Sequence, residues 1–253
     1  MDTNMEVAAG CRYTARLADK LGKKQEAAYY RAKESDILHA VSQQLWSEEK
    51  GAYYPYVIPE KRREEVLMAS TFLGLAIPGS DTTRIKKLCR LLVDDQAFNW
   101  HTLPLTSVAK YDPLFTTVQG DYIGNPCWSG SVWTLTNRAA IRSLHVAEQH
   151  ELAAQLACKT LVAFENNWSE FVHPFTGSGE GVRQYAWSAS QYIQILLEDL
   201  IGVQYSAENG FSVQPHIPVA YAQETIRVED LPLPNGARAE IEIKNQIPSW
   251  KLY

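Results

Sequence analysis

Residues 124–137 read GNPCWSGSVWTLTN and join a long irregular stretch to a helix. Between Asp94 and Gly130 neither helical nor strand periodicity is found, and glycines and prolines interrupt the chain. Apolar residues then return at helical spacing over about 131–150 and 151–166. The feature that decides the fold is therefore a long, tryptophan-containing loop placed at the start of a helix.

The same arrangement recurs at 168–185, WSEFVHPFTGSGEGVRQY, which leads into a helix expected at 186–201. Earlier apolar stripes predict helices ending near Leu21, at 24–46, at 64–77 and after a capping Ser80. No repeat of fixed period is found, which disfavours a solenoid. About seven helices with long aromatic loops at one end predict a mainly α protein of the α/α toroid type.

After Gly202 the pattern changes to period two, as in Ala239, Ile241 and Ile243, with turn signals at Asn209-Gly210 and Asn235-Gly236. We therefore expect two parts, a helical domain over 1–203 and a small β tail over 204–253.

Composition excludes several classes of function. The chain has 253 residues, 45% of them hydrophobic, and a net charge of -5 without a basic stripe, so nucleic acid and anionic membranes are not expected partners. The N-terminus lacks the basic and apolar regions of a signal peptide, and no apolar run could span a bilayer, so a cytoplasmic protein is expected. The four scattered cysteines show no metal-ligand spacing. Neither a metal site nor a cofactor is predicted.

Four segments, taken in order, resemble motifs of (α/α)6-barrel glycoside hydrolases related to mannosyl-oligosaccharide glucosidase, trehalase and glucosylglycerate hydrolase. Residues 124–137 are similar to the family's Tyr-Trp-Arg-Gly-Pro-Val-Trp-x-x-x-Asn, and 170–190, EFVHPFTGSGEGVRQYAWSAS, to its Glu-x-x-x-Pro-x-x-Gly followed by Phe-Ser-Trp-Thr/Ser-Ala. LPLTSVAKYDP at 103–113 is similar to Pro-Ser-x-x-x-x-Asp-Pro, and LWSEEKGAYYPY at 45–56 to Leu-Trp-Asp-x-x-x-Gly-x-Tyr-Tyr. The resemblance covers 1–203 and implies a six-hairpin glycosidase toroid. The β tail is also similar to the one that follows many such barrels.

Hydrolysis of a glycosidic bond needs two carboxyl groups, an acid for the leaving oxygen and a base or nucleophile on the other ring face. On the family's motif, the base that activates water in an inverting reaction falls on Glu170. Indole faces complement the apolar faces of sugar rings, and amides fix hydroxyls. The resemblance places substrate-binding positions at Trp128, Gly130, Trp133, Asn137 and Trp187.

Structural alternatives stay open for each of these residues. Glu170 could be a solvated loop carboxylate or a helix cap, and each tryptophan could anchor a helix end in the core. Asn137 could bond the loop backbone. Glu180, His101 and His173 are expected to be ordinary loop residues.

Two departures from the family pattern matter. Ser129 and Ser131 stand where the family has Arg and Pro, and losing the guanidinium removes a bidentate clamp on a hydroxyl or carboxylate. The opening MDTNMEVA resembles the start of a mid-barrel helix, so the chain looks like the C-terminal half of a catalytic domain. The family's general acid is an Asp that precedes this point, and it has no counterpart here unless Asp2 or Asp112 substitutes.

Half a toroid leaves apolar helix flanks uncovered, so we expect either self-association or a missing N-terminal half as partner. Three functions remain. The first is an inverting glycoside hydrolase acting on an oligosaccharide or small glycoside, with α-glucosides or α-mannosides as the expected substrates. The second is a non-catalytic sugar-binding remnant, and the third is a glycoside phosphorylase. Phosphate dependence separates the first from the third, and sugar binding without product identifies the second.

Overall fold

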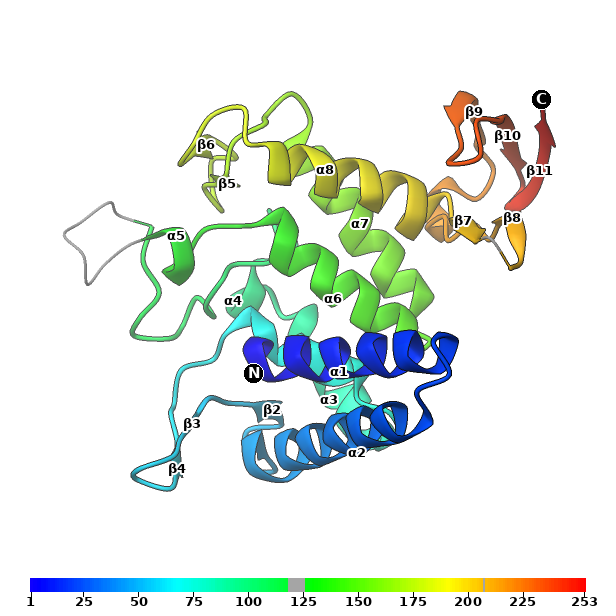
Figure 1. The fold of residues 1–253 in the computed structure, drawn as a ribbon. Coiled ribbons are helices and arrows are strands. Elements are labelled where there is room, and N and C mark those ends of the chain that lie inside the picture. The colour runs from blue at the N-terminus through cyan, green and yellow to red at the C-terminus, as the bar shows by residue number, and fades with distance from the viewer. Residues whose placement is uncertain (118–125, 207) are drawn as a thin grey trace. The chain divides into compact units, whose positions relative to one another are not determined.

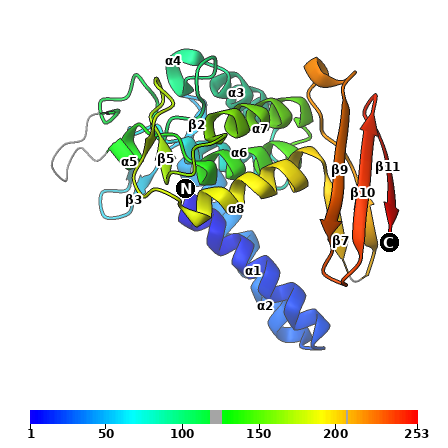
Figure 2. The same cartoon turned by 90° about the horizontal axis from the view of Figure 1, so that it is seen from above.

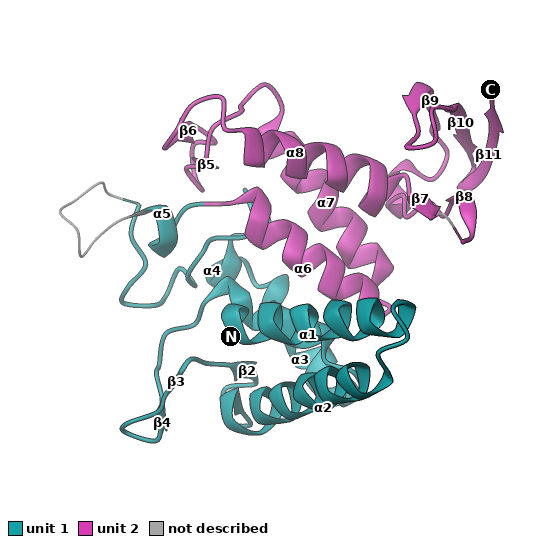
Figure 3. Ribbon diagram, viewed as in Figure 1, with its two compact units in different colours: residues 1–131 teal, residues 132–253 magenta. Residues whose placement is uncertain are grey.

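The computed structural model describes residues 1–117, 126–206 and 208–253, which divide into two compact units, 1–131 and 132–253 (Figure 3). Both units contain helices, and the longer strands lie near the C-terminus. Within the described ranges no helix has the length and apolar character needed to cross a bilayer. The division at 131/132 does not test the expected domains, so the boundary at residue 203 stays a prediction.

The first unit begins with a helical hairpin of α1 (Asp2–Lys20) and α2 (Lys24–Ala40), visible in Figure 2. Gly22 makes the reversal with φ of 72°, a left-handed conformation that glycine adopts without strain. The two helices bury small side chains, among them Ala15 and Ala27, so their backbones can approach closely. Arg12 Nε donates to Glu34 Oε1 at 2.6 Å across the pair. A π-helical turn, η1 (Val41–Leu45), extends α2 almost to the expected end of its helix.

Short elements follow in the first unit: β1 (Trp46–Ser47), β2 (Ala52–Tyr53), β3 (Tyr56–Val57), β4 (Arg62–Arg63), the 3-10 helix η2 (Ala69–Ala76), α3 (Thr82–Leu92), α4 (Asp95–Phe98) and α5 (Pro126–Ser129). The helix expected at 64–77 is thus shorter and begins later. The reason is that the backbone N–H groups of Leu67 and Ala69 donate to Asp112 Oδ2 and to the Ser107 carbonyl, both at 2.9 Å. Those donors are committed to the 103–113 segment and cannot close helical turns.

The cap of α3 also differs from the expected one. Asp81 is the N-cap, and its carboxylate accepts the Thr83 N–H at 2.9 Å. The Ser80 hydroxyl instead donates to the Ile77 carbonyl at 2.8 Å. An aspartate one position later competes successfully for the cap because its carboxylate is the stronger acceptor near a helix N-terminus.

The second unit contains α6 (Thr134–Val146), α7 (His150–Phe164) and α8 (Ala186–Gln194), which continues as the π-helical segment η3 (Ile195–Leu200) (Figure 1). Polar contacts join these helices. Arg138 on α6 donates through Nε to Asp199 Oδ2 at 3.1 Å, and Asp199 is buried. Burial raises the pKa of Asp199, while Arg138 and Arg142 oppose that rise.

The β tail consists of the hairpin β7 (Val203–Ser206) and β8 (Gly210–Val213), the short helix η4 (Val219–Tyr221), and an antiparallel sheet of β9 (Thr225–Pro232), β10 (Arg238–Lys244) and β11 (Ile247–Leu252) with β10 in the middle. Its core is made by five aliphatic residues: Ile201, Val213, Ile217, Ile241 and Ile243. Strands β8, β9 and β10 carry the predicted alternation. Strands β7 and β11 do not alternate, and β9 departs from alternation only at Glu229-Asp230, where two exposed residues are adjacent.

The junction between η3 and β7 leaves no room for a side chain at Gly202. An added Cβ would lie 1.7 Å from the Gln214 carbonyl oxygen, and the residue has φ of 76°. The Gln214 N–H donates to the Gly202 carbonyl at 2.9 Å, so the two backbones are held together.

We predict that Gly202→Ala lowers the free energy of unfolding by roughly 3 kcal/mol or more, since strain and overpacking add. Gly210→Ala is the matched control, because Gly210 has φ of 70° with open space around it. That variant should lose only about 1 kcal/mol. Urea unfolding followed by circular dichroism measures both, and equal losses would contradict the packing argument.

Candidate active site

The hairpin of β5 (Phe171–Val172) and β6 (Gly179–Glu180) holds the predicted base, Glu170, at its open end. The Glu170 N–H donates to the Val182 carbonyl at 2.9 Å, and its own carbonyl accepts the Ser188 hydroxyl at 3.1 Å. Its Oε2 accepts the Val182 N–H at 3.1 Å. Both backbone and side chain of this half-buried residue are therefore fixed. Within the described part of the chain, Oε1 makes no hydrogen bond and is available to a water molecule or ligand.

Gly181 is required for this position of the carboxylate. Its φ is 72°, and an added Cβ would lie 2.6 Å from Glu170 Oε2 and 2.7 Å from the ring of Phe171. Glycine therefore supplies both the left-handed turn and the space in which the carboxylate meets the Val182 N–H.

A two-residue bridge joins the hairpin to the start of α6. Val132 and Val172 exchange N–H to carbonyl hydrogen bonds, each of 3.0 Å. Beside the bridge, the rings of Trp133 and Phe171 pack with centroids 5.1 Å apart. The end of the 124–137 motif and the beginning of the 170–190 motif, far apart in sequence, thus meet in one unit.

The predicted sugar-binding residues of the second unit fall into two kinds. Trp133, the N-cap residue of α6, is 3% exposed, and Asn137 on the same helix is fully buried. The Asn137 amide donates to Thr160 Oγ1 on α7 at 2.9 Å, so it links the two helices. Trp187, in the first turn of α8, is 45% exposed and has Tyr185 beside it. Trp187 can offer an indole face, whereas Trp133 and Asn137 pack against protein. A sugar-binding role for all three stays a prediction.

Trp168 begins the second tryptophan-containing loop and lies far in sequence from the start of α8. It follows the end of α7 and packs edge-to-face on Tyr192 at 5.2 Å.

In the first unit, Ser131 of the 124–137 motif contacts Ser107 of the 103–113 segment. The Ser131 carbonyl accepts both the Ser107 N–H at 3.1 Å and the Ser107 hydroxyl at 2.6 Å. Gly130 is buried, and an added Cβ there would lie 2.1 Å from the Thr116 carbonyl oxygen, so this position excludes a side chain. Trp128, on α5, is 49% exposed. The motif positions Gly124 and Asn125 lie outside the described residues.

Asp112, one of the two candidates to replace the missing general acid, is buried and accepts hydrogen bonds from the backbone. Its Oδ2 accepts the Leu67 N–H at 2.9 Å and its Oδ1 the Leu114 N–H at 3.0 Å. Both carboxylate oxygens are thus occupied by backbone amides, so the side chain holds Leu67 and Leu114 in place and offers no oxygen to a substrate. Asp2, the other candidate, is exposed and accepts the Thr3 N–H.

His101 and His173, the two histidines considered in the sequence analysis, lie in loops. His101 is exposed and has Asp95 as neighbour. The Nδ1 of His173 accepts the N–H groups of Phe175 and Thr176, both at 3.3 Å, which turns the loop after β5.

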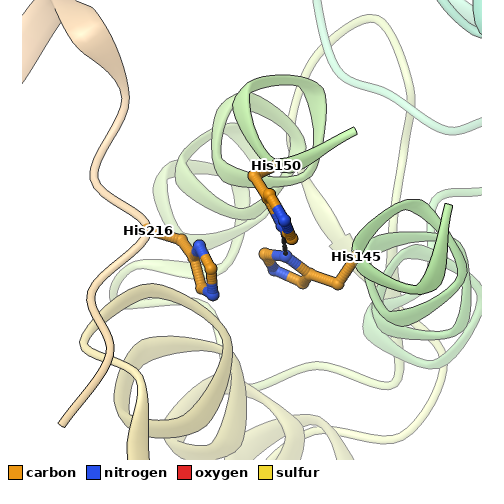
Figure 4. A group of neighbouring side chains, drawn as sticks. All are labelled: His145, His150 and His216. Atoms are coloured by element: carbon orange, nitrogen blue, oxygen red, sulfur yellow. Dashed lines mark hydrogen bonds between the residues drawn. The ribbon is translucent and has the colours of Figure 1, made fainter. Parts of the chain in front are cut away.

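Three other histidines, which were not predicted as site residues from the sequence, lie together in the second unit (Figure 4). His145 is near the end of α6, His150 begins α7, and His216 lies in the irregular stretch after β8. The pairing of His145 and His150 across a short turn is a weak sequence signal. Nothing local indicates that His216 joins them, because that depends on how the tail folds back.

The helices, with long loops at their ends and short strands near the C-terminus, are of the α/α toroid class. Residues 1–188 match the family of mannosylglycerate hydrolase MGH1-like glycoside hydrolase domains, and the chain belongs to this family.

The mannosylglycerate hydrolase of Rubrobacter radiotolerans is 25% identical over 189 residues, which cover 74% of this chain and 41% of the relative. The GH63 mannosylglycerate hydrolase of Thermus thermophilus, solved with glucose, superposes with a TM-score of 0.63 at 23% identity over 76% of this chain and 46% of its own. A solved structure named as a sialidase has a TM-score of 0.78 at 14% identity, covering 99% of this chain and 24% of its own. The chain thus spans less than half the length of each of these three relatives. The family match and the structural similarity confirm the predicted family and fold class.

We predict that Gly181→Ala displaces the Glu170 carboxylate and breaks its bond to Val182. Amide hydrogen exchange at Val182, followed by NMR, should then accelerate at least about 10-fold, as expected when a protecting hydrogen bond is lost. Gly22→Ala is the control, with the same φ of 72° and open surroundings. If Val182 exchanges at the same rate in Gly181→Ala and the parent, Gly181 does not set the carboxylate position.

Proposed function

We propose that the chain forms the general-base half of an inverting glycoside hydrolase that acts on small α-mannosides or α-glucosides. The observation that carries the proposal is the geometry of Glu170. The Val182 N–H donates to its Oε2, while Oε1 can accept a hydrogen bond from water. The hairpin that follows Glu170 is hydrogen-bonded to the start of α6 through Val132 and Val172. A fixed carboxylate with one open oxygen suits a base that must hold a water molecule in line with the anomeric carbon.

In the proposed reaction, Glu170 takes a proton from water as the water oxygen bonds to the anomeric carbon. The bond to the leaving-group oxygen breaks on the opposite face, where an acid donates a proton. The family resemblance assigns that acid to an Asp preceding the matched region. Asp112 is a poor substitute, because its two oxygens already accept backbone amides. In an inverting enzyme the two carboxyl groups stand roughly 6.5–9.5 Å apart.

The substrate class is inferred from the names of the relatives and from the exposed aromatic side chain of Trp187. The curated relative is a mannosylglycerate hydrolase, and one Thermus structure was solved with Tris and D-glycerate. Trp187 offers an exposed indole to an apolar sugar face. Ser129 replaces the family's Arg, so a carboxylate aglycone loses one bidentate clamp. Mannosylglycerate and glucosylglycerate should be tested first, together with uncharged glycosides of the same sugars.

Glu170→Gln, made in the complete polypeptide in which residues 1–253 occur, should lower turnover at least about 10³-fold with little change in substrate binding. The amide keeps the size of the side chain and cannot take the proton. Sugar release measures turnover, and calorimetry measures binding. Glu180→Gln, in the same hairpin, is the control and should stay within about 5-fold of the parent. Retained turnover in Glu170→Gln would remove Glu170 from the role.

The same assay separates the two other functions. Turnover that requires inorganic phosphate would identify a phosphorylase. Quenching of tryptophan fluorescence by sugar without product formation would identify a binding protein.

A further inference from the structure

We propose that His145, His150 and His216 form a binding site for a divalent transition-metal ion of the zinc class, which fastens the segment after β8 to the turn between α6 and α7. The proposal is independent of the glycosidase function. The three residues lie away from the Glu170 hairpin in sequence, and among the described residues none of them hydrogen-bonds to Glu170.

The geometry is that of three ligands from three separate segments. His145 Nδ1 and His150 Nδ1 are 3.0 Å apart, and one ligand atom from each of the three residues can be chosen so that all lie within 4.8 Å of one another. The rings of His145 and His216 have centroids 4.4 Å apart, and those of His150 and His216 are stacked at 4.7 Å (Figure 4). Nitrogens bonded to one tetrahedral zinc ion stand roughly 3.3 Å apart, given Zn–N bonds of about 2.0–2.1 Å.

The His145–His150 pair, at 3.0 Å, is already near that spacing, and nitrogens 4.8 Å apart must close by about 1.5 Å. The stacked rings of His150 and His216 must also turn so that their in-plane lone pairs converge on the ion. His216 can supply this movement, because it lies outside any helix or strand. His145 and His150, by contrast, are set by helices on either side of a short turn.

The protonation state also suits a metal. Burial, followed by the neighbouring rings of His216 and His150, lowers the pKa of His145 to about 4. Burial and His150 likewise lower the pKa of His216. Both shifts favour neutral imidazole, which is the form that coordinates a metal ion.

A path to the site exists. A cavity of about 720 Å³ is lined by His145 and His216 together with Asp199 and Tyr205. Arg142 also lines it and would repel a cation, but Glu198 and Asp199 lie within 3.5 Å of its guanidinium and offset its charge. The cavity can admit the ion and a water molecule as the fourth ligand.

The test is calorimetric titration of the chelator-treated chain with zinc sulfate, with cobalt(II) absorption as a second readout. We expect about one ion per chain, a tetrahedral cobalt spectrum and a higher melting temperature with zinc. His150→Gln and His216→Ala should each weaken zinc binding at least about 10-fold and abolish the cobalt band. His39→Ala, an exposed histidine in the other unit, is the control and should bind like the parent.

His150→Gln guards against a trivial loss of folding, because His150 is exposed and glutamine keeps a polar side chain there. A parent chain that binds no zinc, or binds it equally well in both ligand variants, would overturn the site. The three rings would then be a packed aromatic cluster and nothing more.

Discussion

The pair of hydrogen bonds between Val132 and Val172 is the interaction on which the candidate site depends. It fastens the β5–β6 hairpin to the chain entering α6, and it brings Trp133 against Phe171. Glu170 immediately precedes that hairpin, so the position of its carboxylate follows from the bridge, from Gly181 and from the Ser188 hydroxyl. A site built in this way on loops keeps its geometry because each loop backbone is bonded to another.

The helices beneath the loops are joined by polar groups as well as by apolar packing. Asn137 and Thr160 link α6 to α7, and Arg138 with the buried Asp199 links α6 to η3. Buried polar contacts of this kind are costly unless satisfied, and they therefore favour one register between neighbouring helices. That register fixes how α6 and α8 lie along each other, and each carries one of the site's tryptophans, Trp133 or Trp187, at its N-terminal end.

Periodicity was sufficient to predict the helices of the second unit and the middle strand of the tail, since each has a buried stripe or face. It failed at 64–77, because Leu67 and Ala69 donate their backbone N–H groups to Asp112 and Ser107, which lie in a distant segment of the chain. The motif loops could be placed at helix ends from sequence, and Glu170 could be chosen by resemblance. The burial of Trp133 and Asn137 could not be predicted, because it depends on contacts with Phe171 and Thr160. The histidine cluster was missed for the same reason, as His216 reaches it only through the fold of the tail.

The role proposed for Glu170 is to activate water rather than to attack the sugar itself. The anomeric configuration of the first sugar released from an α-mannoside by the complete polypeptide, followed by NMR before mutarotation, distinguishes the two reactions. We expect the inverted β-anomer, because water attacks the face opposite the leaving group. An α-anomer as first product would mean a covalent intermediate and would contradict the role given to Glu170.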